Sequence, residues 1–440
     1  MTPQANRTSA APDRKNLGTS AKSVVPLAPE ILRKQRRERA EMTVTAGSIL
    51  YDPAKGPADQ HRTVWCNRGI KSGREDVGVY RRLDGSGARL SNTVMCGSVW
   101  TCPTCSGPIQ EQRRRELQAG LVASTGQGLH AYLLTLTFPH NQFEHNLAAG
   151  APENGVKFHA YVRDLVLAED QAVKRFKQSP AWRDLKAHKG AVGSVRGREV
   201  TFGQNGPHPH THTLIFAAPG LLADQAFLDR LRLAWVSAIT KAGICPRDKR
   251  AWALERAFDL RGGDKAAEYI AKFGHDEKWG MSSELTRHTA KIGLRGGLAD
   301  FEGHVTPFQV LAWAEQGDAN ARRLFHAYAL AYHGRRQLTW SPGLRKRFGV
   351  CDLSDEEITN TPQPEEQCVG MIDDEQLGVL VQRRAVPEFK DWIAEFAACQ
   401  ADIDDIVGII RSRPPLAKPW ITKGGRLLTF PKFEQEKEAA

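Results

Sequence analysis

Apolar and polar positions in the middle of the chain switch repeatedly between a two-residue period and a helical period. The first such run, rich in leucine and threonine and closed by Pro139, predicts a buried strand. An Asn-Gly pair between two later strands is typical of a hairpin turn. The expected elements, in chain order, are a strand at 131–138, a helix at about 155–187, strands at 192–202 and 208–217, a helix at 221–243, a strand at 253–260 and a helix at 264–273.

This order of strand, helix, strand, strand, helix, strand and helix predicts an α+β domain. Its central sheet should be mainly antiparallel, with helices on one face. A later helix is expected to open at Thr306 and Pro307, where threonine can cap a helix and proline can begin one. The predicted regions are a disordered basic tail at 1–45, a cysteine-rich region at 60–125, the α+β domain at 126–300, a helical extension at 301–350 and a helical C-terminal region of unknown role at 351–440.

The charge balance of the chain favours a polyanionic partner. Its 440 residues include 61 Lys and Arg against 50 Asp and Glu, which gives a net charge of +11 and a pI of about 9.3. A basic surface at neutral pH favours nucleic acid. We find no run of about eighteen apolar residues and no apolar stretch of a secretory signal near the N-terminus. We therefore expect a cytoplasmic protein with reduced thiols and no membrane partner.

Three histidines at alternating positions form a candidate metal site. His208, His210 and His212 would project from one face of a strand, because side chains in a strand alternate between its faces. Imidazole is a good ligand for divalent transition metals. Neighbouring same-face positions lie ~7 Å apart, so two of the three can share an ion, whereas all three require a bend. Glu199, on the preceding strand, is a further candidate ligand, and structural or surface histidines are the alternative interpretation.

A tyrosine and a lysine share one face of the predicted helix at 264–273. Tyr269 and Lys272 are three positions apart, which makes them neighbours on a helix. A phenol with a pKa of about 10 is a poor nucleophile unless a cation or a base assists it. A lysine in this place stabilises a phenolate and also contacts phosphate. The alternative is a core tyrosine beside a solvated lysine.

Four of the eight cysteines are clustered. Cys102 and Cys105 form a Cys-x-x-Cys knuckle, and Cys96 precedes it by six residues. Cys66 or His61 would complete a tetrahedral set, which is how structural zinc is held. A redox pair is the alternative, but no βαβ context of the thioredoxin kind surrounds this knuckle.

Basic residues occur in two further runs. Arg113, Arg114 and Arg115 fall on a polar helix expected at 110–121, where they can lie along a phosphate backbone or form an ordinary solvated helix face. The basic run at 33–37 falls in the predicted tail, where we expect it to be solvated.

Together these segments resemble the Rep proteins of bacterial plasmids that replicate by a rolling circle, which are members of the HUH endonuclease superfamily. The similarity spans roughly residues 60–348 and keeps the family's order of motifs. The segments that carry it are the knuckle Cys102-Pro103-Thr104-Cys105, the first motif Leu134-Thr135-Leu136-Thr137 with Pro139-His140, the metal motif Pro209-His210-Thr211-His212, the tyrosine motif Glu268-Tyr269-Ile270-Ala271-Lys272-Phe273, and the downstream segments 306–309 and 334–341.

The resemblance implies an HUH-like nicking and joining domain at 126–300 with a catalytic divalent ion, magnesium or manganese. His210 and His212 would hold this ion, with His208 or Glu199 as the third ligand. The ion would polarise a phosphate of single-stranded or hairpin origin DNA. Zinc in the cysteine knuckle, bound by Cys66, Cys96, Cys102 and Cys105, would be structural.

For the tyrosine motif, the resemblance implies covalent chemistry. Tyr269 would attack the phosphate to give a 5′-phosphotyrosine and a free 3′-OH, and Lys272 would steady the phenolate or the phosphate. A host helicase and a host DNA polymerase would then act at the nicked origin in the bacterial cytoplasm, with the 3′-OH as primer.

Two positions depart from the family's pattern. Thr211 stands where a bulky apolar residue is usual. Lys265 stands where some members carry an acid one turn before the tyrosine, which activates the water that ends replication. Asp264 and Glu268 are nearby substitutes, but neither shares the tyrosine's face of a helix.

Other functions fit parts of the same pattern. A conjugative relaxase or a single-strand transposase would use similar motifs, although a tyrosine that follows the histidines favours a Rep or transposase order. A non-catalytic, zinc-containing DNA-binding regulator would leave Tyr269 dispensable. A metal-dependent hydrolase would cleave without a covalent step.

Overall fold

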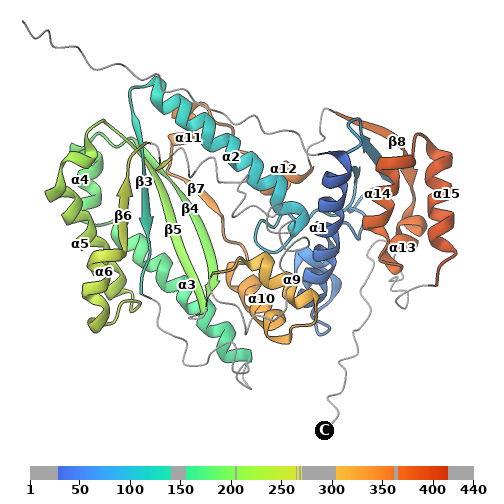
Figure 1. Ribbon diagram of the computed structural model, residues 1–440, viewed down its shortest axis with the longest axis horizontal. Helices are drawn as coiled ribbons and strands as arrows, with labels where there is room; N and C mark the ends of the chain where they lie inside the picture. Colours follow the sequence, from blue (N-terminus) through green and yellow to red (C-terminus); the bar gives the residue numbers. More distant parts are fainter. Residues whose placement is uncertain are drawn as a thin grey trace, which may run out of the picture.

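The computed structural model describes most of the chain. The described residues are 28–139, 155–203, 206–263, 265–266, 269, 304–360 and 365–414, and for 155–158 only the backbone is described. Within these ranges two antiparallel sheets and the helices around them form an α+β fold, as the sequence predicts (Figure 1). In the described part of the chain, no helix is long and apolar enough to cross a lipid bilayer.

A five-stranded antiparallel sheet carries the histidine motif. Its order is β6-β3-β5-β4-β7, so the long strands β4 and β5 are flanked by shorter ones. The sequence predicts the first four strands in chain order and misses β7. The strands are β3 His130–Leu136, β4 Gly193–Gly203, β5 Gly206–Ala217, β6 Phe258–Arg261 and β7 Leu338–Trp340.

Helices cover both faces of this sheet, which corrects the prediction that they cover one. One face packs on α3 Gly155–Lys177, α4 Pro180–His188, α5 Gln225–Lys241 and α6 Arg250–Arg256. The other face packs on α2 Pro103–Gly126 and α11 Leu344–Phe348. The reason is the uninterrupted apolar run in β5, because Leu214 and Phe216 are buried on the α2 side and Ile215 on the α3 side.

Two predicted elements have different boundaries. The helical stretch at 155–187 is interrupted at Ser179, whose side chain accepts a hydrogen bond from the Trp182 N–H and caps a second helix that opens with Pro180. The predicted strand at 253–260 begins only at Phe258, because its first residues complete α6. That segment, Ala-Leu-Glu-Arg, consists of strong helix formers, and a run this short does not fix the period.

The N-terminal region is folded from Pro29 onward, which corrects the prediction of a disordered tail to residue 45. Helix α1 Pro29–Leu50 buries Met42 and Ala46 in a core shared with α9 Pro307–Glu315 and α10 Ala319–Tyr332. The basic run at 33–37 is solvated only in part, since Lys34 and Arg37 are exposed as predicted but Arg36 donates to Ser86. As predicted, Thr306 caps α9 by accepting a hydrogen bond from the Gln309 N–H.

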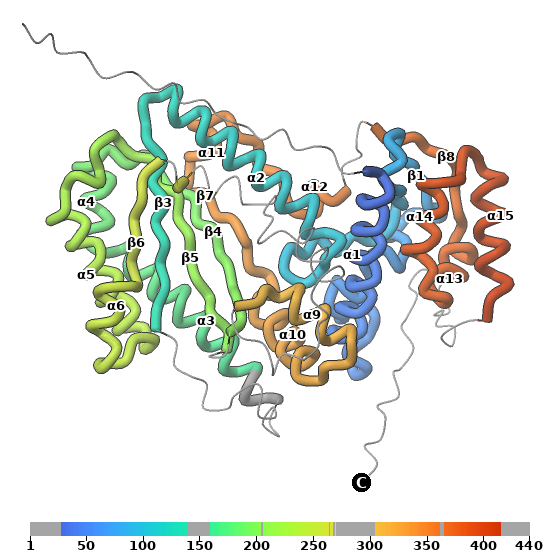
Figure 2. The backbone as a smooth tube through the Cα atoms, in the orientation of Figure 1, coloured from blue at the N-terminus to red at the C-terminus, as the bar shows by residue number. Residues whose placement is uncertain are grey.

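The C-terminal region forms a small second sheet with strands from the cysteine-rich region. Strand β8 Glu366–Ile372 pairs with β1 Val77–Arg82, which pairs with β2 Ala88–Leu90, and Figure 2 shows these distant segments side by side. We call β1, β2 and residues 365–414 the C-terminal module. Its helices are α13 Asp374–Gln382, α14 Val386–Phe396 and α15 Gln400–Arg411. Other helices in the described part of the chain are α12 Asp355–Asn360, η1 Pro57–Asp59, η2 Arg62–Trp65, η3 Leu221–Ala223 and η4 Arg247–Lys249.

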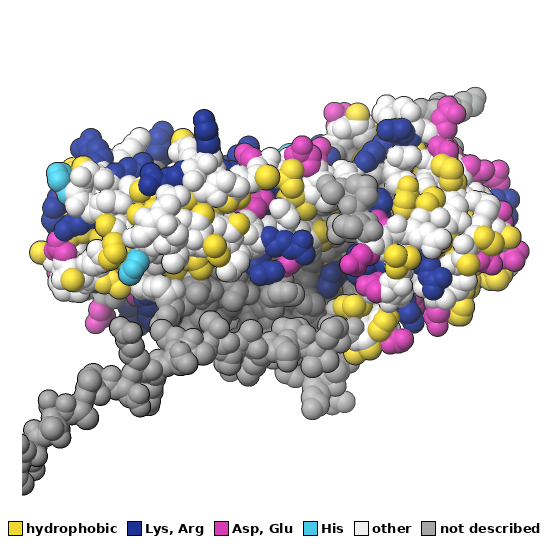
Figure 3. Space-filling view, turned by 90° about the horizontal axis from the view of Figure 1, so that it is seen from above, with side chains coloured by type: hydrophobic (Ala, Val, Ile, Leu, Met, Phe, Trp, Pro, Cys, Tyr) yellow, Lys and Arg dark blue, Asp and Glu magenta, His cyan; other side chains and the backbone are white. Residues whose placement is uncertain are grey.

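Charge is unevenly distributed over these parts. Residues 365–414 contain eleven Asp and Glu against five Lys and Arg, although the whole chain has a net charge of +11. In Figure 3, Lys and Arg gather over the half that holds the five-stranded sheet, and Asp and Glu are frequent at the opposite end, over the C-terminal module. The excess of positive charge therefore lies outside the C-terminal module.

Candidate active site and metal centres

The pairing of β4 with β5 brings a carboxylate to the histidine strand. Glu199 lies directly opposite His210, and Gly197 lies opposite His212. Because residues that face each other in an antiparallel pair project to the same side, Glu199 joins the histidine face. The side chains of Glu199, His210 and His212 are 30%, 15% and 17% exposed, so the group is partly buried but reachable from outside.

Three possible ligand atoms converge there, one each from Glu199, His210 and His212. His210 Nε2 and His212 Nε2 lie 3.2 and 3.5 Å from Glu199 Oε2. His208 lies outside this group, and its Nε2 instead hydrogen bonds with Thr137 Oγ1 at 2.7 Å. Adjacent oxygen or nitrogen ligands of an octahedral magnesium or manganese ion are roughly 3 Å apart. The Glu199, His210 and His212 set therefore fits such an ion.

The predicted nucleophile lies against this group. Tyr269 is a buried helical residue whose ring centroid is 5.0 Å from that of His212. It belongs to a buried hydrophobic cluster that also contains Leu117 and Leu338, and its hydroxyl lies close enough to Glu199 to interact with the carboxylate. The structure thus brings Tyr269 together with the candidate metal ligands, although it lies 57 or more positions from them in sequence. Lys272, Asp264 and Glu268 lie outside the described residues, and their predicted roles stay predictions.

The ionisable groups of the site shift one another's pKa values, and Glu199 is at the centre of these effects. Burial opposes ionisation of Glu199, but His212 and His210 outweigh it and lower the pKa of Glu199. Burial also disfavours a charged His210, yet the bond to Glu199 raises the pKa of His210. Burial and the nearby Glu199 charge raise the pKa of Tyr269 well above its usual value. A divalent cation bound by Glu199 would offset the effect of that charge on the phenol.

The absence of a side chain at Gly197 makes room for the hydroxyl of Tyr269. A Cβ atom at this position would overlap Tyr269 Oη. If Tyr269 is the nucleophile that the motif resemblance implies, we expect Gly197→Ala to displace it from the Glu199, His210 and His212 group and to lower DNA cleavage on the order of 100-fold, the cost of misplacing a reacting group by about 1 Å. A nicking assay beside a thermal melt checks this. Wild-type cleavage by a folded Gly197→Ala protein would show that Tyr269 does not act from this position.

Behind the histidine strand lies a polar cluster that the sequence analysis missed. Thr211, the departure from the metal motif, is buried and donates a hydrogen bond of 2.6 Å to Glu169 Oε1 on α3. The neighbouring Asp170 pairs with Arg198 and Arg335. The hydroxyl of Thr211 thus has a buried acceptor, which explains how a polar residue is accommodated where the motif that it resembles has an apolar one.

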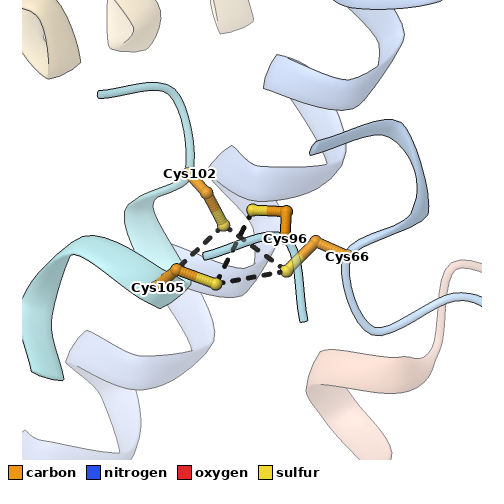
Figure 4. Close-up of side chains that lie close together, drawn as sticks. All are labelled: Cys66, Cys96, Cys102 and Cys105. Carbon is orange, nitrogen blue, oxygen red and sulfur yellow. Dashed lines mark hydrogen bonds between the residues drawn. The ribbon is translucent and has the colours of Figure 1, made fainter. Parts of the chain in front are cut away.

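The four clustered cysteines converge on a second candidate metal centre. All are buried, and the Sγ atoms of Cys66, Cys96, Cys102 and Cys105 lie within 4.8 Å of one another (Figure 4). The Cys102–Cys66, Cys66–Cys105 and Cys96–Cys105 Sγ distances are 3.5, 3.6 and 3.7 Å. A tetrahedron with zinc–sulfur bonds of about 2.3 Å has edges of roughly 3.8 Å. The group therefore fits zinc. Of the two candidates for the fourth position, Cys66 lies in this group and His61 does not.

The three arginines of α2 have different surroundings. Arg113 turns inward, where it pairs with Glu116 and Asp355 at 2.6 Å each, and its side chain is 10% exposed. Carboxylates of the fold hold the Arg113 guanidinium, which leaves little of it open to a phosphate, and the phosphate contact stays a prediction for Arg113. Arg114 and Arg115 both pair with an acid on the same helix and are 22% and 67% exposed, and for them a phosphate contact stays a prediction.

Comparison with known proteins finds a similarity to one protein named Rep, in agreement with the motif resemblance, but no matching family model or solved structure. The chain is 28% identical over 297 residues to a protein named Protein rep from Streptomyces lividans, an alignment that covers 58% of this chain and 64% of that protein. It is 31% identical over 153 residues to a neomycin resistance protein from Streptomyces cyanogenus, which covers 32% of this chain and 34% of that protein. The chain thus spans less than two thirds of the length of either relative. No family model and no solved structure matches the chain.

Proposed function

We propose that this protein is a plasmid replication initiator that nicks and rejoins single-stranded origin DNA through a phosphotyrosine at Tyr269. One observation carries the proposal. The phenol of Tyr269 and a carboxylate–histidine group suited to a divalent ion meet on one face of a sheet, with the Tyr269 ring 5.0 Å from that of His212. The similarity to a protein named Rep supports the same assignment.

The proposed reaction is a reversible phosphoryl transfer. Tyr269 Oη forms a bond to the scissile phosphorus, the bond from phosphorus to the 3′ oxygen breaks, and the phenol proton ends on the released 3′-OH. The DNA 5′ end stays on the tyrosine. Attack by a 3′-OH reverses each of these changes and rejoins a strand without ATP, because the phosphodiester energy is retained in the phosphotyrosine.

The residues of the site have separate tasks in this reaction. Glu199, His210 and His212 would hold the magnesium or manganese ion, which when bound supplies Lewis-acid activation of a non-bridging phosphate oxygen. The apolar packing around Tyr269 fixes the direction of its hydroxyl. The positively charged half of the protein would bind the DNA backbone, and a host helicase and polymerase would act at the released 3′-OH.

A covalent-adduct assay tests the proposal. Full-length protein is incubated with manganese and labelled single-stranded oligonucleotides that tile the replicon encoding this chain, and is then run on a denaturing gel. We expect a protein–DNA adduct for the wild type and for the control Tyr80→Phe, whose tyrosine lies on β1 in the C-terminal module. We expect complete loss of the adduct for Tyr269→Phe, because phenylalanine keeps the packing and removes the nucleophile.

The other outcomes identify the competing functions. Cleavage without an adduct would indicate a metal-dependent hydrolase, and DNA binding without cleavage would indicate a zinc-containing regulator. A relaxase or transposase would also form the adduct, but Tyr269→Phe would then leave replication of the plasmid intact. Loss of plasmid replication in Tyr269→Phe is the result that the proposal requires.

A further inference from the structure

We infer that Thr135, on the strand beside the histidine motif, is a positioning residue that sets the ring of His212 for metal binding. This inference rests on the proposed function, because it assigns a role toward the metal of that site. Thr135 belongs to the Leu-Thr-Leu-Thr segment of β3, for which neither the motif pattern nor the comparisons give a task.

The contact follows from the register of β3 on β5. Thr135 lies directly opposite His212, and Thr135 Oγ1 is 3.1 Å from His212 Nδ1. The other ring nitrogen of His212, Nε2, points to Glu199 Oε2. A ring whose Nε2 binds a cation carries its proton on Nδ1, and the threonine oxygen is then the acceptor of that proton. Thr135 thereby selects the tautomer that presents Nε2 to the ion.

The second histidine ligand is arranged in the same way by a different partner. His210 Nδ1 is 3.2 Å from the backbone carbonyl oxygen of His208, and its Nε2 also points to Glu199. Both ligands therefore have Nδ1 held by an oxygen and Nε2 directed at one carboxylate. For His210 the oxygen is part of the backbone and cannot be changed by mutation. For His212 it is a side chain, so this half of the arrangement can be tested.

A second threonine–histidine pair, with Thr137 one residue past the end of β3 and His208 on β5, supplies a matched control. Thr137 Oγ1 lies 2.7 Å from His208 Nε2, a contact at least as short as that of Thr135. His208 lies outside the group of metal ligands. Removing either threonine hydroxyl thus removes one hydrogen bond to a histidine of β5. Only the Thr135 change affects a histidine, His212, that is a candidate metal ligand.

The test measures manganese affinity of the full-length protein by electron paramagnetic resonance of the free ion. Outer partners of histidine ligands typically contribute about 10- to 100-fold to metal affinity. We therefore expect Thr135→Val to weaken manganese binding by about that factor, Thr135→Ser to bind within about threefold of the wild type, and Thr137→Val to bind like the wild type. Saturating manganese should restore cleavage by Thr135→Val, since the loss is one of affinity.

The results that would contradict the positioning role differ from those that would contradict the proposed function. Wild-type manganese affinity in a folded Thr135→Val protein would overturn the positioning role while leaving the proposed function standing. An equal loss in Thr137→Val, or in Thr135→Ser, would also overturn it, because the effect would then come from the strand as a whole and not from the hydroxyl beside His212. Absence of manganese binding by the wild-type protein would instead contradict the proposed function itself.

Discussion

Replacing His210 or His212 by alanine is expected to abolish DNA nicking while leaving DNA binding nearly unchanged. Each change removes one of three converging ligands, and two remaining ligands hold a divalent ion poorly. Lewis-acid activation contributes several kcal/mol to such reactions, so we expect a fall in cleavage on the order of 1000-fold or more. Cleavage is measured as nicking of a labelled oligonucleotide over a series of manganese concentrations. DNA binding is measured separately by fluorescence anisotropy at one fixed salt concentration.

His208→Ala is the control for these variants. It removes an imidazole from the same face of β5, but its bond is to Thr137 and not to the metal group. We expect this variant to keep manganese affinity and most of its nicking activity. If His208→Ala loses nicking as completely as His210→Ala, then His208 and not Glu199 is the third ligand. If all three variants nick DNA normally, the metal assignment fails.

The histidine site shows how far the sequence alone can be taken. Alternation places His208, His210 and His212 on one face, which the structure confirms, but it cannot choose the third ligand. That choice depends on the register between β4 and β5, which puts Glu199 opposite His210. A shift of one residue would turn Glu199 to the other face. Register is set by the whole hairpin, so the local pattern left Glu199 and His208 as equal candidates.

The buried polar pair of Glu169 and Thr211 could not be predicted from the motifs, because it too depends on how separate elements pack. Glu169 falls on the apolar stripe of α3, in helical step with Val162, Val166 and Val173, which are all buried. That placement signals an inward-facing carboxylate. Its partner Thr211 lies on a strand 42 residues away, and only the packing of α3 on the sheet joins them. Asp355, one of the two acids that hold Arg113, is likewise distant from it in sequence.

The cysteine centre lies where two parts of the chain that are far apart in sequence meet. Cys66 and Cys96 precede and follow β1 and β2, and β1 pairs with β8 of the C-terminal module. Lys390 on α14 donates to Asn67 Oδ1 at 3.0 Å, and Asn67 Nδ2 contacts Cys66 Sγ at 3.8 Å. A local motif search finds the four thiols but not this connection to residues 365–414.

Two buried cations beside the thiols match the charge of a zinc centre. Burial lowers the pKa of Arg68 to about 9 and that of Lys390 to about 8, while the thiolates act in the opposite direction and favour both cations. Four thiolates around one zinc ion carry a net charge of −2, which these two cations would balance. Without zinc, mutual repulsion and burial oppose four thiolates. The metal is therefore expected to hold the thiols, the β1–β2 hairpin and α14 in place.

Removing the metal, or one of its ligands, is accordingly expected to release the C-terminal module. Structural zinc contributes about 10–16 kcal/mol of apparent binding free energy in small zinc domains, as much as the whole stability of a typical domain of about 5–15 kcal/mol. We expect one zinc per chain by elemental analysis, and we expect Cys102→Ser or strong chelation to expose residues 51–102 and 365–414 to protease. Cys368→Ser, an exposed cysteine of β8 outside the cluster, is the control and should keep the wild-type cleavage pattern and melting curve. A chelated protein with an unchanged protease pattern would mean that the hydrophobic core of the module, and not the metal, holds β1 and β8 together.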